Sequence, residues 1–271
     1  MVTIDTQRCI CCGNCAADCL CHTIEIVDGK AHVTGSRCID CGHCLAICPV
    51  HAVTMDGYDP QEVLEALETH RFRLDPQQYL RAIQFRRSIR RFRRKPAVTQ
   101  EQLHLILEAG RYAPNGGNRQ AVRVLCIQQS LPEITEMALK VLSTYAIEQE
   151  KQGVTDNPYL ARWKNWYQDY VEQGTDPLFF KAPTVLALVG DPQRKVDAGI
   201  MGAHMELMTQ SQGLGACFIG FFCMAACVSP ELRERLGLHD GEEVLACLAI
   251  GQPLRKYCRT VNRKPTNLTT L

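Results

Sequence analysis

The sequence lacks a strong net charge and any long apolar run, and each absence excludes a class of protein. Its 271 residues carry 30 lysines and arginines against 29 aspartates and glutamates, so no overall electric field favours nucleic acid or a membrane surface. No apolar run reaches the length of a membrane span, and the opening residues MVTIDTQRC contain no apolar signal segment. We therefore expect a cytoplasmic protein with no nucleic-acid or membrane partner.

A separate nicotinamide-binding unit is also missing, because no G-x-G-x-x-G stands between a strand and a helix. What is present is enough apolar material for proper cores, at 46% hydrophobic and 22% charged residues. The length is comfortable for two domains. The patterns described below divide the chain into residues 1–56, a connector at 57–80, and residues 81–271.

Cysteine is abundant, and ten of the sixteen cysteines lie between Cys9 and Cys48. Two runs share the spacing C-x2-C-x2-C-x3-C. Three cysteines at this interval wrap one face of an iron–sulfur cluster, while the fourth ligates the other cluster of a pair. We therefore assign one [4Fe–4S] cluster to Cys9, Cys12, Cys15 and Cys48, and the second to Cys38, Cys41, Cys44 and Cys19. A zinc site and a disulfide framework are the alternatives, although zinc usually takes separated ligand pairs and disulfides need a secreted context.

The duplicated run resembles bacterial two-cluster ferredoxins over residues 1 to about 56. Strand candidates lie at 2–4, 24–27, 31–33 and 52–55, and Asp28-Gly29 predicts a hairpin turn. Leu20 stands where the family often has proline. Cys11 and Cys21 fall outside the ligand pattern and are predicted to have no ligand role. Because so small a domain has little core, the clusters would supply much of its folding energy. The ligand thiols fit a reducing compartment and an organism that lives with little oxygen.

The connector at 57–80 has helix-start signals. Asp59-Pro60 and Asp75-Pro76 each place a capping side chain before a proline, with Glu62 and Gln78 three residues after the caps. Val63, Leu64 and Leu67 predict one apolar stripe. The segment lacks the glycine and serine of a flexible linker, so we expect it to pack the two domains together.

The most basic stretch is RAIQFRRSIRRFRRK, residues 81–95. A solvated face or a nucleic-acid patch is the plain interpretation. The spacing of Phe85, Ile89 and Phe92 instead predicts one buried face, and Ser88 among the cations suits a phosphate monoester. A helix signal follows at Thr99, with Gln102 three residues on, and the pattern stops at the glycine-rich turn 113–118.

Four motifs in order resemble the nitroreductase family over residues 81–271: RRSIRRF (86–92), APNGGNRQ (113–120), APTVLALVGD (182–191) and GLGACFIGFF (213–222). The resemblance implies an α+β protein, with the duplicated ferredoxin-like domain followed by a three-layer α-β-α domain that binds FMN. It implies that Arg86, Arg87, Ser88 and Arg90 hold the FMN phosphate and ribityl chain, with Arg263 as a further phosphate cation. Asn115, Gly116 and Asn118 would contact the isoalloxazine and ribityl oxygens. Gly220 and Phe221 would offer backbone amides to the ring. Ala121 and Phe221 depart from the family pattern.

The remaining patterns have two interpretations each. Trp163, Trp166, Tyr167 and Tyr170 form one face of a helix, which predicts packing or a lid over the flavin within residues 131–181. Cys217, Cys223 and Cys227 are read as small buried hydrophobes rather than as a third metal site. The methionines at 201, 205 and 208 are core or dimer interface. The helix at 197–212 has almost no polar face, so it needs cover on more than one side. The resemblance to the nitroreductase family implies that two such helices pair, so we expect a homodimer with each flavin at the subunit interface.

The cysteine spacing and the two resemblances together imply an FMN- and iron–sulfur-dependent oxidoreductase with no catalytic side chain of its own. Two clusters would relay single electrons to FMN for reduction of a small organic acceptor: a nitro compound, quinone, alkene or flavin. The donor would be an external low-potential carrier such as ferredoxin. The alternatives are an electron-transfer or redox-sensing module, and an NAD(P)H-fed flavoprotein that exports electrons through the clusters.

Overall fold

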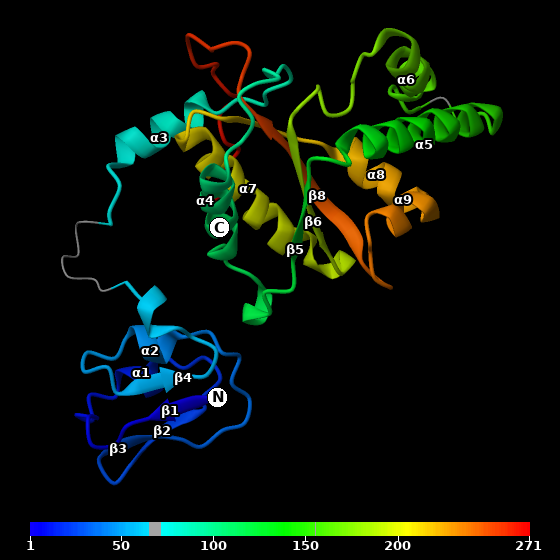
Figure 1. The fold of residues 1–271 in the computed structure, drawn as a ribbon. Coiled ribbons are helices and arrows are strands. Elements are labelled where there is room, and N and C mark those ends of the chain that lie inside the picture. The colour runs from blue at the N-terminus through cyan, green and yellow to red at the C-terminus, as the bar shows by residue number, and fades with distance from the viewer. Residues whose placement is uncertain (65–71, 155) are drawn as a thin grey trace. The chain divides into compact units, whose positions relative to one another are not determined.

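The computed structural model describes residues 1–64, 72–154 and 156–271 (Figure 1). The chain forms two compact units. The first contains Met1–Arg73 and Asn115–Arg119, and the second contains Leu74–Pro114 and Gln120–Leu271. Among the described residues, no helix is long and apolar enough to cross a membrane.

The first unit is built from two antiparallel strand pairs and two single-turn helices. Strand β1 (Val2–Ile4) pairs with β4 (Val53–Met55), and β2 (Ile24–Val27) pairs with β3 (Lys30–Val33). The predicted turn is confirmed, because Asp28 and Gly29 both have positive φ, 48° and 72°, as a two-residue hairpin turn requires. Helices α1 (Asn14–Ala17) and α2 (His43–Ala46) each follow a left-handed glycine, Gly13 and Gly42. The buried core is small and includes Cys15 and Cys44.

At 57–64, the first described part of the connector, the chain is less helical than its sequence predicts. Asp59 caps only a 3-10 turn, η1 (Pro60–Glu62), after which Val63 is extended. Asp75 caps α3 (Pro76–Phe85) by accepting from the Gln78 amide, as expected, but this helix runs five residues beyond the predicted boundary. Leu64 is 93% exposed, so the predicted apolar stripe is not buried there. Leu67 lies outside the described residues.

The second unit contains one sheet of four strands in the order β5-β6-β8-β7, all antiparallel. These are β5 (Arg123–Ile127), β6 (Thr184–Gly190), β7 (Gly215–Phe218) and β8 (Glu243–Gly251). All residues of β6 are buried. The prediction of a central strand within 182–191 is therefore confirmed.

Helices cover both faces of this sheet (Figure 1). One face carries α5 (Leu131–Lys151), α6 (Leu160–Gln173), α8 (Gly220–Val228) and α9 (Pro230–Arg235). The other carries α4 (Gln100–Arg111) and α7 (Lys195–Ser211). Successive β6 residues alternate between the two cores: Val185, Ala187 and Val189 enter one, and Leu186 and Leu188 the other. The short turns η2 (Gly116–Asn118) and η3 (Pro192–Arg194) complete the elements of the described chain.

The basic segment is extended after Phe85, and this corrects the prediction of one periodic buried face. Phe85 is 46% exposed at the end of α3, whereas Ile89 and Phe92 are buried. The segment is tied to the sheet edge, since the Ile89 amide donates to Ala216 O at 2.9 Å and the Arg93 amide to Gln252 O at 2.8 Å. A Cβ on Gly215 would collide with Ile89. Backbone pairing, rather than helical periodicity, fixes residues 86–93.

Helix α4 has the predicted capping box between Thr99 and Gln102, and it packs against the methionines of α7. Met205 is fully buried within its own chain, and a Cβ on Gly110 would lie 2.9 Å from its Cγ. The core interpretation is therefore confirmed for Met205, while Met201 and Met208 are half-buried against the same core. Met205 cannot lie at a seam between subunits.

Candidate functional site

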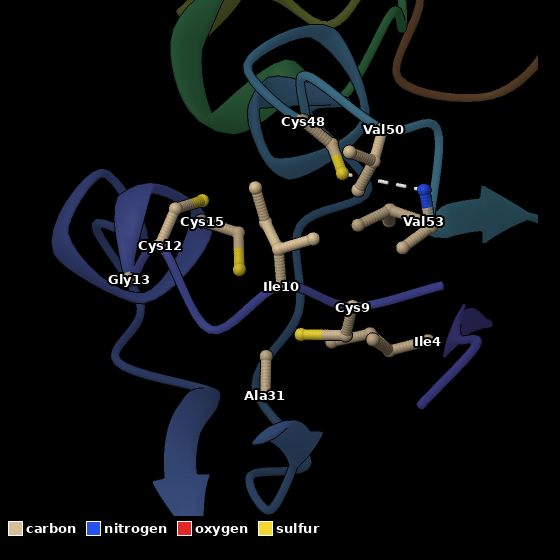
Figure 2. Close-up of a pocket in the computed structure, with 11 residues that line it drawn as sticks. Ile4, Cys9, Ile10, Cys12, Gly13, Cys15, Ala31, Cys48, Val50 and Val53 are labelled. Atoms are coloured by element: carbon tan, nitrogen blue, oxygen red, sulfur yellow. Dashed lines mark hydrogen bonds between the residues drawn. The ribbon is translucent and has the colours of Figure 1, made fainter. Parts of the chain in front are cut away.

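Four cysteines from distant parts of the first unit surround one cavity (Figure 2). Cys9, Cys12 and Cys15 come from the first run and Cys48 from the end of the second, and all line an empty space of about 330 Å³ that is partly open to solvent. Apolar side chains fill the gaps between them, including Ile4, Ile10 and Val53. This set is the one that the spacing assigned to the first cluster.

A second cavity, of about 400 Å³ and also partly open, has the reciprocal set. Cys38, Cys41 and Cys44 from the second run line it together with Cys19 from the end of the first. Cys21 lines this cavity as well. Cys11 lines neither cavity.

The described cysteines of the two cavities are not drawn together as they would be around a single zinc ion. Zinc holds its thiolates about 2.3 Å away, so its ligands crowd together. In the part of the chain that the structure describes, no three His, Cys, Asp or Glu side chains are placed to hold one metal ion. All sixteen cysteines are free thiols, which gives the disulfide alternative no support.

Backbone amides point at the sulfur atoms of both sets. The Ala52 amide donates to Cys48 Sγ at 3.3 Å and the Thr23 amide to Cys19 Sγ at 3.4 Å. Hydrogen bonds from the backbone of Ala31 and Cys11 lower the pKa of the Cys9 thiol, and Lys30 adds to this effect. Such donors stabilise a thiolate ligand and tune a cluster that it holds.

The predicted phosphate-side residues lie along the edge of the second unit's sheet. Ser88 forms a bridge with Ala216 of β7. Ser88 and Arg90 both face the Cys217 thiol. Burial raises the pKa of this thiol, whereas these two side chains lower it. The Arg87 guanidinium lies over the Tyr257 ring, 5.8 Å from its centroid, which brings the C-terminal segment to the basic stretch. Arg263 is exposed farther along that segment.

Arg86 has a partner that the sequence reasoning missed. Its Nη1 donates to Glu206 Oε1 on α7 at 3.0 Å, with side-chain exposures of 25% and 10%. Burial raises the pKa of the Glu206 carboxyl, and Arg86 acts in the opposite direction. The sequence contained a signal for this ion pair, because Glu206 is the only acidic residue between Ala198 and Ser211.

Removing Arg86 should therefore destabilise the second unit. Arg86→Ala leaves a largely buried carboxylate without its counter-charge, at an expected cost of about 1–3 kcal/mol in the free energy of unfolding, between the values for exposed and buried pairs. Urea denaturation measures this. The double variant Arg86→Ala/Glu206→Gln removes the unpaired charge, so it should recover part of the loss. Equal losses in the single and double variants would contradict the pairing.

The other predicted flavin contacts lie at two turns. Asn115, Gly116 and Asn118 form the turn at η2, where Asn118 has a φ of 50°. Gly220 and Phe221 begin α8 directly after β7. The contacts of these residues with a flavin stay predictions.

Phe221 meets the tryptophan-bearing helix. Its ring centroid lies 5.0 Å from those of Tyr159 and Trp163 and 5.8 Å from that of Trp166. Trp163 is 2% exposed. Packing is therefore the role that the structure shows for this aromatic face, and the lid stays a prediction.

Cys217, Cys223 and Cys227 do not form a third metal site, because two are buried or half-buried thiols and one is exposed. Burial raises the pKa of Cys223 to about 11 and also raises that of Cys217, while Cys227 is exposed. Thiols that stay protonated are poor metal ligands.

Comparison with known proteins decides the family. Residues 83–252 match the sequence profile of the Nitroreductase family, which is more than half of the chain. The chain belongs to the nitroreductase family. The motifs at 86–92, 113–120, 182–191 and 213–222 all fall inside the matched range, and residues 1–82 fall outside it.

A curated relative in Vibrio harveyi is an NADPH-flavin oxidoreductase, 29% identical over 168 residues, which are 62% of this chain and 62% of the relative. The chain thus spans less than two thirds of that relative's length. An FMN-bound nitroreductase structure from Desulfitobacterium hafniense is 26% identical, with a TM-score of 0.53, covering 70% of this chain and 97% of that one. Another, from Bacteroides fragilis, is 23% identical, with a TM-score of 0.57, covering 71% and 97%. The nitroreductase fold of the second unit is therefore shown.

Proposed function

We propose that this chain is an FMN-dependent oxidoreductase in which two [4Fe–4S] clusters relay electrons to the flavin. The observation that carries the proposal is the pair of cavities, each lined by three cysteines of one run and the fourth of the other. The domains would be residues 1–56 for the clusters, 57–80 for the connector and 81–271 for FMN.

The residues present fit both groups. Cys9, Cys12, Cys15 and Cys48 would hold one cluster and Cys38, Cys41, Cys44 and Cys19 the other, with amide donors already aimed at the sulfurs. Arg87, Ser88 and Arg90 would bind the FMN phosphate, for which their charge-assisted donors are suited. Arg86, Asn115, Gly116, Asn118, Gly220, Phe221 and Arg263 complete the proposed flavin contacts. FMN binding is supported by the family and by the FMN-bound relatives.

When bound, the clusters supply one-electron transfer and the flavin converts it into two-electron reduction of an organic acceptor. The chain's own residues then bind, orient and shield. The apolar side chains that line the first cavity would reduce the contact of a bound cluster with water. Pairing with the sheet edge fixes the backbone of the extended segment 86–93, and so fixes the points from which its arginine side chains extend. A nitro compound, quinone, alkene or flavin are the proposed classes of acceptor.

The donor distinguishes this proposal from its main alternative, direct reduction by NAD(P)H, which the NADPH-flavin oxidoreductase relative favours. We expect reduced ferredoxin to bleach the flavin absorbance of the full-length protein anaerobically, and to do so much more slowly in Cys19→Ser. Flavin reduction by NADPH should not depend on Cys19. Rapid bleaching by NADPH and none by reduced ferredoxin would establish the alternative.

We also propose a homodimer, now through a face of α7 that excludes Met205. Four apolar residues follow one another at helical spacing: Val196, Ile200, Ala203 and Leu207. Val196 and Ala203 are exposed, Val196 at 72%, and the other two are half-buried. An apolar face of this kind needs a partner. Ala203→Arg should give a monomer by sedimentation, whereas the exposed control Lys140→Asp on α5 should stay dimeric. A monomeric unmodified protein would contradict the proposal.

A further inference from the structure

The two cysteine runs are near-copies that differ in charge. RCICCGNC (8–15) and RCIDCGHC (37–44) are identical except where Cys11 corresponds to Asp40 and Asn14 to His43. Their backbones also agree, since Cys11 and Asp40 have φ values of 57° and 50°, and Gly13 and Gly42 of 73° and 75°. The flanking arginines, Arg8 and Arg37, occur in both. The charge difference is therefore confined to a few positions on equivalent backbones.

The first cavity has a cation beside it and no carboxylate in its lining. Lys30, at the start of β3, is partly buried, and its Nζ donates to the carbonyl oxygen of Cys9 at 2.6 Å. This bond holds the ammonium next to a proposed ligand. The nearby Asp5 is occupied by the amides of Gln7 and Arg8.

The second cavity has an anion beside one of its cysteines instead. Asp40 Oδ1 lies 3.5 Å from Cys38 Sγ. The other acid near this loop, Asp18, has Oδ2 at 2.9 Å from His43 Nδ1. No lysine lines this cavity.

Hydrogen bonds to sulfur do not cancel this difference. The first site has the Ala52 amide on Cys48 Sγ, and the second has the amides of Thr23 and Asp40 on Cys19 Sγ and Cys38 Sγ, each at 3.4 Å. The second site also has the Thr23 hydroxyl, 3.3 Å from Cys19 Sγ. That hydroxyl favours the reduced form at the second site and so opposes Asp40. A neutral dipole, however, acts over a shorter range than a full charge, and reduction adds a full negative charge to a cluster.

We propose that Lys30 and Asp40 set the two cluster sites at different reduction potentials, so that the site of Cys9, Cys12, Cys15 and Cys48 is reduced first. This inference rests on the proposed function, because it requires both clusters to be present. Each site takes one electron from the reductant. Electrons that enter the pair would then collect at the Lys30 site, which gives the relay an internal order.

The test is an anaerobic redox titration of the full-length protein with dithionite, in which the spins of the reduced clusters are counted by electron paramagnetic resonance. We expect two one-electron steps. Lys30→Gln should lower the potential of the higher-potential step by about 59 mV, which is about tenfold in the one-electron reduction equilibrium. Lys30→Arg keeps the charge, so its higher-potential step should stay where it is in the unmodified protein. Asp40→Asn should move the lower step up, by less at high salt because Asp40 is exposed.

The duplication supplies a reciprocal variant. Cys11→Asp places the carboxylate at the equivalent position of the first loop, where the backbone already suits Asp, and should lower the upper step. Glu25→Gln, on the exposed side of β2, removes a carboxylate that lines neither cavity and should move neither step. A single step in protein with both clusters loaded, or equal potentials in Lys30→Gln and Lys30→Arg, would overturn this inference alone. Protein without iron would overturn the proposed function, and this inference with it.

Discussion

Replacing Cys19 with serine is expected to lower the iron content from about eight to about four atoms per chain. Although Cys19 belongs to the first run in sequence, it lines the cavity of Cys38, Cys41 and Cys44. Serine cannot replace a thiolate as a soft ligand, so this cluster should be lost while the other remains. Iron and acid-labile sulfide assays on anaerobically purified protein measure the effect.

Double variants show which cluster Cys19 serves. Cys19→Ser/Cys41→Ser should keep about four iron atoms, because both changes strike the same site, whereas Cys19→Ser/Cys12→Ser should lose nearly all iron. Cys11→Ser is the matched control, since Cys11 lines neither cavity, and should keep about eight. The reverse pattern in the two double variants would show that the fourth ligand does not cross over.

Replacing Arg87 with alanine should weaken FMN binding by about 1.5–3 kcal/mol, the value of a charge-assisted hydrogen bond, which is roughly 10- to 150-fold in the dissociation constant. Arg87 is held over the Tyr257 ring, so its guanidinium is partly ordered before a phosphate arrives. The FMN affinity of Arg87→Lys should lie between those of the unmodified protein and Arg87→Ala, because lysine keeps the charge but lacks the planar guanidinium fork. Flavin fluorescence during titration of the apoprotein gives the affinity.

Arg94 is the control for this variant, as an exposed arginine of the same basic stretch that belongs to no proposed flavin contact. Arg94→Ala should leave the affinity nearly unchanged. If both variants weaken binding equally, the stretch acts through its overall charge, and Arg87 has no specific role. Unchanged affinity in Arg87→Ala would remove it from the site.

The first unit was largely predictable because its constraints are local. Cysteine spacing names the ligands, and Asp28-Gly29 can hardly form anything but a tight turn, so strands β2 and β3 fall into register around it. The exchange of the fourth cysteines also follows from spacing alone, and the two cavities contain the expected sets. The caps at Asp75 and Thr99 are similarly short-range signals.

In the second unit, local sequence patterns do not predict the structure at several positions. Phe85, Ile89 and Phe92 have helical spacing, but Ile89 is buried because its backbone pairs with Ala216, over a hundred residues later. Glu206, the partner of Arg86, likewise lies far along the chain, on α7. Met205 is apolar, as an interface residue would be, yet Gly110 of α4 leaves room for it inside its own chain. Tertiary contacts at long sequence separation override local periodicity at each of these positions.

The central claim is that one chain carries two iron–sulfur clusters and one FMN, and the composition of the unmodified protein tests it most directly. Protein purified without oxygen should contain about eight iron, about eight sulfide and about one FMN per chain, and no stoichiometric zinc. About four iron atoms per chain after verified full loading, or zinc in place of iron, would contradict it.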